Sequence, residues 1–176
     1  MHRRSEPGGV LHYRHASEVA TEGVGAPVER TLIIVKPDGI QRGLVGKVLT
    51  RLEDKGLRLA GLKLMTVSKD LAETHYGEHR EKPFFGDLVS FITSAPVVVG
   101  VVEGPNAVSV TRGLVGATNP AEAAAGTIRG DYGLSIGMNI IHASDAPETG
   151  KREVSLFFDD SEIIDYNREI ERWIIE

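Results

Sequence analysis

Two hydrophobic patterns alternate along this chain, and their order is the feature that most constrains its fold. Short, β-rich apolar runs lie at residues 31–35, 57–67, 97–102 and 139–142. Between these runs, and after the last one, apolar residues recur at helical spacing. This order predicts a βαββαβ core, which indicates an α+β, ferredoxin-like antiparallel sheet with helices on one face.

Local signals set the expected helix bounds. The turn residues Lys36-Pro-Asp-Gly39 end the first strand. Ser68 is a good N-cap for the helix after the second strand. Gly104-Pro105 would open a further helix, because proline is tolerated in a first turn. We expect helices over residues 44–52, 68–76, 84–92 and 104–114, and a last one between Asp145 and about Phe157.

Two segments carry no sustained apolar period. Residues 116–137 contain several glycines and are longer than most connections in a compact domain. Loops of that length are usually functional, so we expect a long functional loop here. Residues 1–28 lack the apolar stretch of a secretory signal. We expect them to be a flexible N-terminal extension, which leaves residues 29–176 as one domain.

Charge and cysteine content exclude several kinds of function. The chain has 20 Lys+Arg against 25 Asp+Glu, a formal net charge of −5, which opposes nucleic acid as the primary partner. Cysteine is absent, so thiolate zinc sites and cysteine nucleophiles are excluded. That absence fits a reducing interior, and we expect a cytoplasmic location. No apolar run approaches the roughly 20 residues that span a bilayer, so we expect no membrane segment.

Sequence motifs that bind phosphate through glycines fail here. Around Gly46-Lys47, a Walker A loop would need glycine where Gln41 stands and Ser or Thr where Val48 stands. If the chain handles nucleotides, its side chains rather than a glycine loop must hold the phosphates.

The histidines are candidate reactive groups, and each has a plainer explanation. His75 and His79 have the spacing of a shared metal site on a helix. Without a third ligand nearby, a solvent-facing or phosphate-contacting pair is favoured. Ser144 and Asp145 follow His142 too closely for a hydrolase triad. Taken alone, His142 at the end of an apolar strand is best explained as a structural histidine.

The surroundings of His142 shift that balance. Arg112, Thr118 and Arg129 lie before and within the long loop that leads to it. Guanidinium groups suit bidentate phosphate recognition. A neutral imidazole among them can attack phosphorus with one ring nitrogen while a partner holds the other.

Several stretches, in this order and spacing, resemble the nucleoside diphosphate kinase family over residues 29–176. They are residues 29–46 (ERTLIIVKPDGIQRGLVG), His75-Tyr76, Lys82-Pro-Phe-Phe85, Gly116-Ala-Thr-Asn-Pro120, Gly126-Thr-Ile-Arg-Gly-Asp131 and Asn139-Ile-Ile-His-Ala-Ser-Asp145. The resemblance implies a ferredoxin-like subunit in a homo-oligomer, a hexamer or tetramer. It also implies transfer of the γ-phosphate of a nucleoside triphosphate, typically ATP, to a nucleoside diphosphate.

The resemblance also implies roles for individual residues. His142 would be phosphorylated on a ring nitrogen in a ping-pong reaction, and Glu153 would orient its ring. The transferred group and the sugar would lie near Lys36, Tyr76 and Asn139. The phosphates would be held by Arg112, Thr118 and Arg129, with a contact from His79. The base would stack on Phe84, with Leu88 beside it and Ile136 on its other side. Mg²⁺ would bridge phosphate oxygens with few or no protein ligands.

One alternative belongs to another functional class. A catalytically silent nucleotide-binding scaffold or regulatory protein could share this pattern. Such a relative would be expected to lose the histidine or a phosphate ligand, whereas every matched position is filled here. The departures are modest, because Ala143 and Ala146 stand where glycine and serine are usual and neither is a reacting group.

Overall fold

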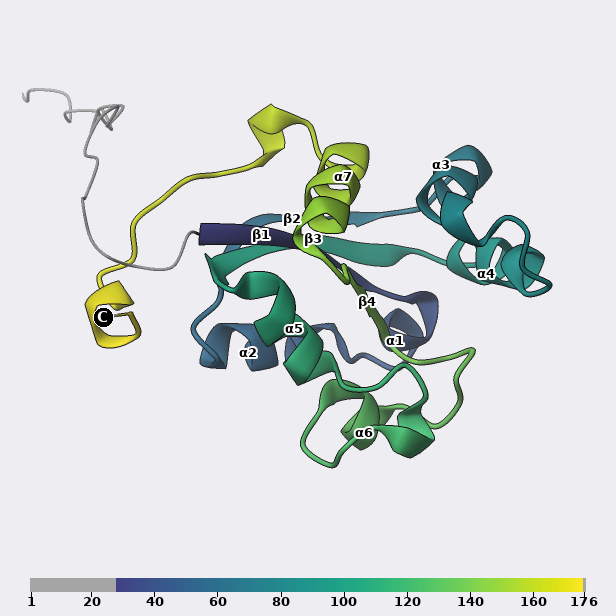
Figure 1. The fold of residues 1–176 in the computed structure, drawn as a ribbon, viewed down its shortest axis with the longest axis horizontal. Helices are drawn as coiled ribbons and strands as arrows, with labels where there is room; N and C mark the ends of the chain where they lie inside the picture. The colour runs from purple at the N-terminus through teal and green to yellow at the C-terminus, as the bar shows by residue number, and fades with distance from the viewer. Residues whose placement is uncertain (1–27, 176) are drawn as a thin grey trace, which may run out of the picture.

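A four-stranded antiparallel sheet forms the centre of the computed structural model, which describes residues 28–175. The strands are β1 (Val28–Val35), β2 (Arg58–Met65), β3 (Val97–Pro105) and β4 (Ile141–Ala143), in the order β2-β3-β1-β4 (Figure 1). This order is that of a βαββαβ unit, so the expected α+β architecture is confirmed. The expected N-terminal extension lies outside the described residues, except that Val28 is the first residue of β1.

Register places the short strand β4 against the end of β1. β1 pairs with β3 along its whole length, from Val28 opposite Pro105 to Val35 opposite Val98. β4 pairs with β1 over three positions only, and His142 lies opposite Ile34. Because β4 is so short, the ladder alone holds this strand weakly.

Helices cover both faces of the sheet. Ile33 and Val35 pack with Val48 of α2 (Val45–Asp54) and with α5 (Ala107–Val115). Leu32 and Ile34 pack in a second cluster with α3 (Lys69–His75), α4 (Phe85–Ile92) and α7 (Pro147–Phe157). In Figure 1, α7 lies on the opposite side of the sheet from α2 and α5.

The crossover helices α2 and α5 lie on one face, as expected. The prediction that all helices lie on that face is wrong, because α3, α4 and α7 cover the other face. The reason lies in the central strands. β1 and β3 are apolar at successive positions, so both of their faces must be buried.

The helix boundaries agree with most local signals. Ser68 caps α3, because its hydroxyl accepts from the Leu71 N–H at 3.2 Å. The turn expected at residues 36–39 is the short helix α1 (Pro37–Gln41), with proline in its first turn. Gly104 and Pro105 belong to β3 instead, and α5 begins after Asn106. Within residues 28–175, no helix is long and apolar enough to cross a membrane.

The long loop is more ordered than its sequence indicated. It contains a 3₁₀ turn, η2 (Pro120–Glu122), and the helix α6 (Ile128–Tyr132). Arg51 of α2 ties it down by donating to the Gly126 carbonyl at 2.6 Å and to the Asp131 carboxylate at 2.5 Å. The Gly126 N–H and Arg51 together hold the pKa of Asp131 below its usual value.

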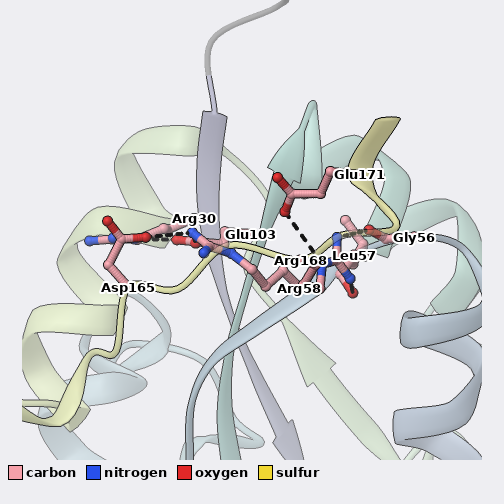
Figure 2. A network of polar contacts seen from close by, with 8 residues as sticks. All are labelled: Arg30, Gly56, Leu57, Arg58, Glu103, Asp165, Arg168 and Glu171. Atoms are coloured by element: carbon pink, nitrogen blue, oxygen red, sulfur yellow. Dashed lines mark hydrogen bonds and ion pairs between the residues drawn. The ribbon is translucent and has the colours of Figure 1, made fainter. Parts of the chain in front are cut away.

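The C-terminal segment is held against the strands at the far end of the sheet by polar contacts (Figure 2). The buried Glu103 carboxylate accepts from Arg30 and Arg58, and Arg58 also pairs with Asp165. Arg168 donates to the carbonyls of Gly56 at 2.8 Å and Leu57 at 3.2 Å. On the sheet, these contacts involve β1, β3, the first residue of β2 and the two residues before it, away from the residues expected to form the functional site.

Candidate active site

A cleft of about 810 Å³ gathers the side chains that the sequence singled out. Its lining includes every predicted site residue except Glu153: Lys36, Tyr76, His79, Phe84, Leu88, Arg112, Thr118, Arg129, Ile136, Asn139 and His142. These residues come from the end of β1, the α3–α4 region, α5, the long loop and β4. The topology thus brings segments more than a hundred positions apart into one cavity.

His142 projects from β4 with one ring nitrogen already engaged. Its Nε2 lies 2.9 Å from Oε2 of Glu153 on α7, and its side chain is 21% exposed. The same carboxylate oxygen accepts from the Ser144 hydroxyl at 2.7 Å. Because Glu153 occupies Nε2, Nδ1 is the nitrogen left for a ligand in the cleft. Glu153 lies behind the cleft wall, which is why it does not line the cavity.

The ionisation of Glu153 follows from opposing effects. Burial raises the pKa of the carboxyl group, but the hydrogen bond and charge of His142, with the bond from Ser144, outweigh burial and leave the pKa below its usual value. The carboxylate is therefore charged, and when His142 is neutral it accepts from Nε2–H, the tautomer that leaves Nδ1 unprotonated.

His75 lies beneath His142, which the expectation of a solvent-facing or phosphate-contacting histidine pair did not foresee. Its side chain is 2% exposed, and its ring meets the His142 ring edge-on with centroids 4.6 Å apart. Burial, followed by the charge of His142, lowers the pKa of His75 to about 3, so this imidazole is neutral. His79 instead lines the cleft with a side chain that is 38% exposed, so only this histidine of the pair faces solvent.

Within residues 28–175, His75, His142 and Glu153 form the one group whose ligand atoms lie close enough to share a metal, all within 4.8 Å of one another. Two imidazoles and one carboxylate suit zinc or copper better than magnesium, which prefers oxygen ligands. His75 and Glu153 are also buried, and Glu153 is already bonded to His142, so the group does not match the Mg²⁺ that the resemblance implies.

A polar relay connects the cleft to the long loop. Lys36 donates from Nζ to Oδ1 of Asn139 at 2.7 Å, and Asn139 donates from Nδ2 to the Thr118 carbonyl at 2.9 Å. Burial, followed by the charge of Arg129, lowers the pKa of Lys36 to about 8. An anion bound beside Lys36 would reverse that shift, so this lysine is prepared for a negatively charged ligand.

Arg129 is nearly fully buried and binds backbone as well as facing the cleft. It donates from Nε to the Asn139 carbonyl at 3.2 Å, from Nη1 to Gly116 at 3.2 Å and from Nη2 to Ile141 at 2.7 Å. Burial, then the neighbouring Arg112, lowers the pKa of Arg129 to about 10, which leaves it charged at neutral pH. Each terminal nitrogen keeps one N–H for a ligand. No sequence pattern indicated this structural role of Arg129.

Exposed apolar side chains form the other part of the cleft. Phe84 is 48% exposed and Ile136 is 61% exposed, and their gathering in one cleft is typical of a ligand-binding site. Phe91 and Met138 also line the cavity, although sequence reasoning did not select them. Tyr76 is buried beside them, and burial, aided by Glu153, raises its pKa, so its phenol keeps the proton as a donor.

An α+β sheet that carries a histidine with a free Nδ1, beside a lysine and two arginines in one cleft, defines a protein built to handle phosphorylated ligands. Comparison with known proteins narrows that class. A family model described as nucleoside diphosphate kinase matches residues 29–163. The chain belongs to the nucleoside diphosphate kinase family, and it is an enzyme with that activity, a transferase acting on nucleotides.

Individual relatives agree over nearly their whole length. The nucleoside diphosphate kinase of Archaeoglobus fulgidus is 60% identical over 149 residues, 85% of this chain and 99% of its own. That of Thermomicrobium roseum is 62% identical over 148 residues, 84% of this chain and 99% of its own. A solved structure of the Halobacterium salinarum enzyme in complex with CDP matches with a TM-score of 0.83 and 53% identity, covering 84% of this chain and 99% of that one.

Proposed function

We propose that this kinase works through His142, whose Nδ1 receives the γ-phosphate of a nucleoside triphosphate and passes it to a nucleoside diphosphate. One observation carries the proposal. The Nε2 of His142 is bound to a buried carboxylate, which leaves Nδ1 in a cleft that also presents Lys36, Arg112 and Arg129. Nucleophile and charge-neutralising groups thus share one cavity.

Each half-reaction is an exchange of one bond to phosphorus. In the first, the Nδ1 lone pair forms an N–P bond while the bond between the γ-phosphorus and the bridging oxygen breaks, and the diphosphate leaves with that electron pair. In the second, a terminal oxygen of the incoming diphosphate attacks the phosphohistidine, and the N–P bond breaks. Donor and acceptor use the same site, so the kinetics are ping-pong.

The surrounding side chains position and neutralise the transferred group. Lys36 and the arginines offset negative charge on the phosphate oxygens. Tyr76 and Asn139 donate to the phosphoryl group and the sugar, and Thr118 and His79 add contacts. Glu153 keeps the Nε2 proton and stabilises the positive charge that develops on the ring as Nδ1 attacks.

The apolar side of the cleft binds the base by stacking. Phe84 offers an exposed ring, with Leu88 beside it and Ile136 opposite. Stacking is tolerant of base identity because every base has a π-face. We therefore propose that purine and pyrimidine nucleotides are both substrates.

Magnesium is proposed as part of the substrate complex. The carboxylates in the cleft lining, Glu78, Asp87 and Asp145, are all exposed, which fits contact with a hydrated cation better than direct ligation. When bound, Mg²⁺ supplies charge neutralisation on the phosphate oxygens. The protein's own cations lie within the same cleft.

Assembly and location are also proposals. β2 is an edge strand whose Leu62 and Leu64 are exposed, which supports burial against further copies of the chain in a hexamer or tetramer. The absence of cysteine supports a cytoplasmic location.

Labelling tests the covalent step. We expect γ-labelled ATP to place acid-labile, alkali-stable label on the wild-type protein, whereas α-labelled ATP should not. The His142→Ala variant should fold and bind nucleotide yet take up no label, because the imidazole is partly exposed on the short strand β4 and its removal opens no deep cavity. Steady-state phosphate exchange by that variant, well above a mock purification, would overturn the proposal. Label on wild type would also exclude the silent scaffold.

A further inference from the structure

The backbone just before His142 is strained. Ile140 has φ 72°, in the left-handed region that a β-branched residue avoids. The Ile141 N–H donates to the Asn139 carbonyl at 2.8 Å, which closes a three-residue γ-turn centred on Ile140. The positive-φ form of this turn is rare and strained, so surrounding contacts must hold it.

The segment after β1 supplies those contacts. Asp38 accepts from the Ile140 N–H at 3.0 Å through Oδ2, and the Lys36 N–H donates to the Ile140 carbonyl at 2.8 Å. Gly39 allows the close approach, because a Cβ there would lie 3.1 Å from the Ile140 carbonyl oxygen and 2.7 Å from a Val35 methyl group. Both backbone polar groups of Ile140 are thus bound from one side.

Arg129 binds the neighbouring carbonyls from the long loop. Its bonds to Asn139 and Ile141 flank the strained residue. Among the groups that hold the turn, only Asp38 is absent from the cleft lining, and its other oxygen, Oδ1, is buried without a hydrogen-bond partner in residues 28–175. A buried carboxylate oxygen without a partner is costly, so a function should explain the position of this side chain.

The turn decides where two site residues point. It lies between Asn139, which meets Lys36, and the three-residue strand that carries His142. If Ile140 relaxed to an extended conformation, the direction of Asn139 relative to His142 would change, because successive side chains of an extended chain alternate.

We propose that Asp38 is a positioning residue for phosphoryl transfer: its carboxylate holds Ile140 in the strained γ-turn, and the turn sets the relative placement of Asn139 and His142. The proposal rests on the role of His142 proposed above. Asp38 touches neither substrate nor the reacting atoms.

A charge effect is the competing explanation. Asp38 lies close enough to Lys36 for its negative charge to favour the protonated amine. Asp38→Asn separates the two effects, because the amide keeps an oxygen that can accept from Ile140 N–H while the charge is lost. Asp38→Ala loses both the acceptor and the charge. Asp38→Ser also loses both effects, because its hydroxyl oxygen is one bond closer to the backbone than a carboxylate oxygen and falls short of the Ile140 N–H.

The test is single-turnover phosphorylation of His142 by saturating Mg-ATP, measured by rapid quench on the full-length protein. We expect about a 10- to 100-fold slower rate in Asp38→Ala and Asp38→Ser, as misplacement of reacting groups by about 1 Å can cause. Asp38→Asn should stay within about threefold of wild type, as should the control Asp54→Ala, an exposed carboxylate at the end of α2. A wild-type rate in Asp38→Ala or Asp38→Ser overturns the proposal, and a rate in Asp38→Asn as slow as in Asp38→Ala assigns the effect to charge.

A second measurement does not depend on catalysis. Hydrogen–deuterium exchange of residues 139–142 should be faster in Asp38→Ser than in wild type and unchanged in Asp38→Asn. Equal protection of residues 139–142 in all three proteins would overturn the proposal that Asp38 holds the turn. A wild-type protein that takes up no phosphate on His142 would overturn the proposed function, and exchange would still decide whether Asp38 holds the turn.

Discussion

The buried imidazole of His75 predicts a specific loss of stability in mild acid. In the folded chain, burial, followed by the charge of His142, lowers its pKa to about 3, against an ordinary value of 6.5. Between these values the unfolded chain binds a proton that the folded chain does not. Stability from this group is therefore complete above pH 6.5 and falls as the pH drops toward 3.

The size of the effect follows from linkage. Lowering the pH from about 7 to about 5 should cost about 2 kcal/mol from this one group. The pKa of the folded state lies well below 5, so the loss is set by the unfolded-state pKa and depends little on the depth of the shift. Solvent screening does not reduce it, because the His75 side chain is 2% exposed.

Urea unfolding measures this loss of unfolding free energy. Wild type and His75→Leu are compared at one protein concentration and at about pH 7, 6 and 5. Leucine has a similar volume and removes two buried ring nitrogens that have no hydrogen-bond partner among residues 28–175, so the fold should be kept. The loss of unfolding free energy on acidification should be smaller in the variant by about 2 kcal/mol. His79→Gln, which removes a histidine from the cleft surface, is the control. Parallel pH curves for wild type and His75→Leu would refute the reasoning.

Four further substitutions test the site and its supporting helix. Glu153→Gln keeps an acceptor for His142 but loses the charge, so His142 phosphorylation should slow about tenfold in rapid quench, the difference between a charged and a neutral hydrogen bond; an unchanged rate would contradict this. Arg112→Lys should lower kcat/KM by on the order of 2–3 kcal/mol in steady-state assays with little change in Tm, because an ammonium cannot reproduce the planar contact. Arg129→Lys should lower Tm as well, since it also loses bonds to three carbonyls, and equal melting temperatures of the two variants would argue against that role. Ala146→Ser should stabilise the protein by about 1 kcal/mol in thermal melts, because α7 begins at an extended Ala146 without a side-chain cap; a lower Tm would count against it.

The sequence predicted what depends on local pattern. Apolar runs located β1 and β3, and the Ser68 cap located α3, because these signals act within a few residues. The residues that line the cleft could be selected because they match motifs of the family that the sequence resembles. Members of a family share a fold, so such motifs indicate which distant residues lie together. Their catalytic roles remain predictions.

The different positions of His75 and His79 follow from the end of α3, which lies close to the end expected at residue 76. The spacing of His75 and His79 places both on one face only if the helix continues. α3 ends at His75, and a 3₁₀ turn begins at Gly77. The two side chains therefore diverge, one toward Glu153 and the other into the cleft.

The γ-turn at Ile140 could not be predicted at all, since isoleucine is among the residues least suited to a positive φ. It exists because distant groups hold it: Asp38 and Lys36 from the end of β1, and Arg129 from α6. Lys36 and Arg129 also face the cleft. The three residue pairs between β4 and β1 hold the short strand only weakly, so β4 is held largely by groups that also line the cleft. A substitution at Lys36 or Arg129 will therefore alter phosphate binding and strand placement together, whereas Asp38, in our proposal, reports on placement alone.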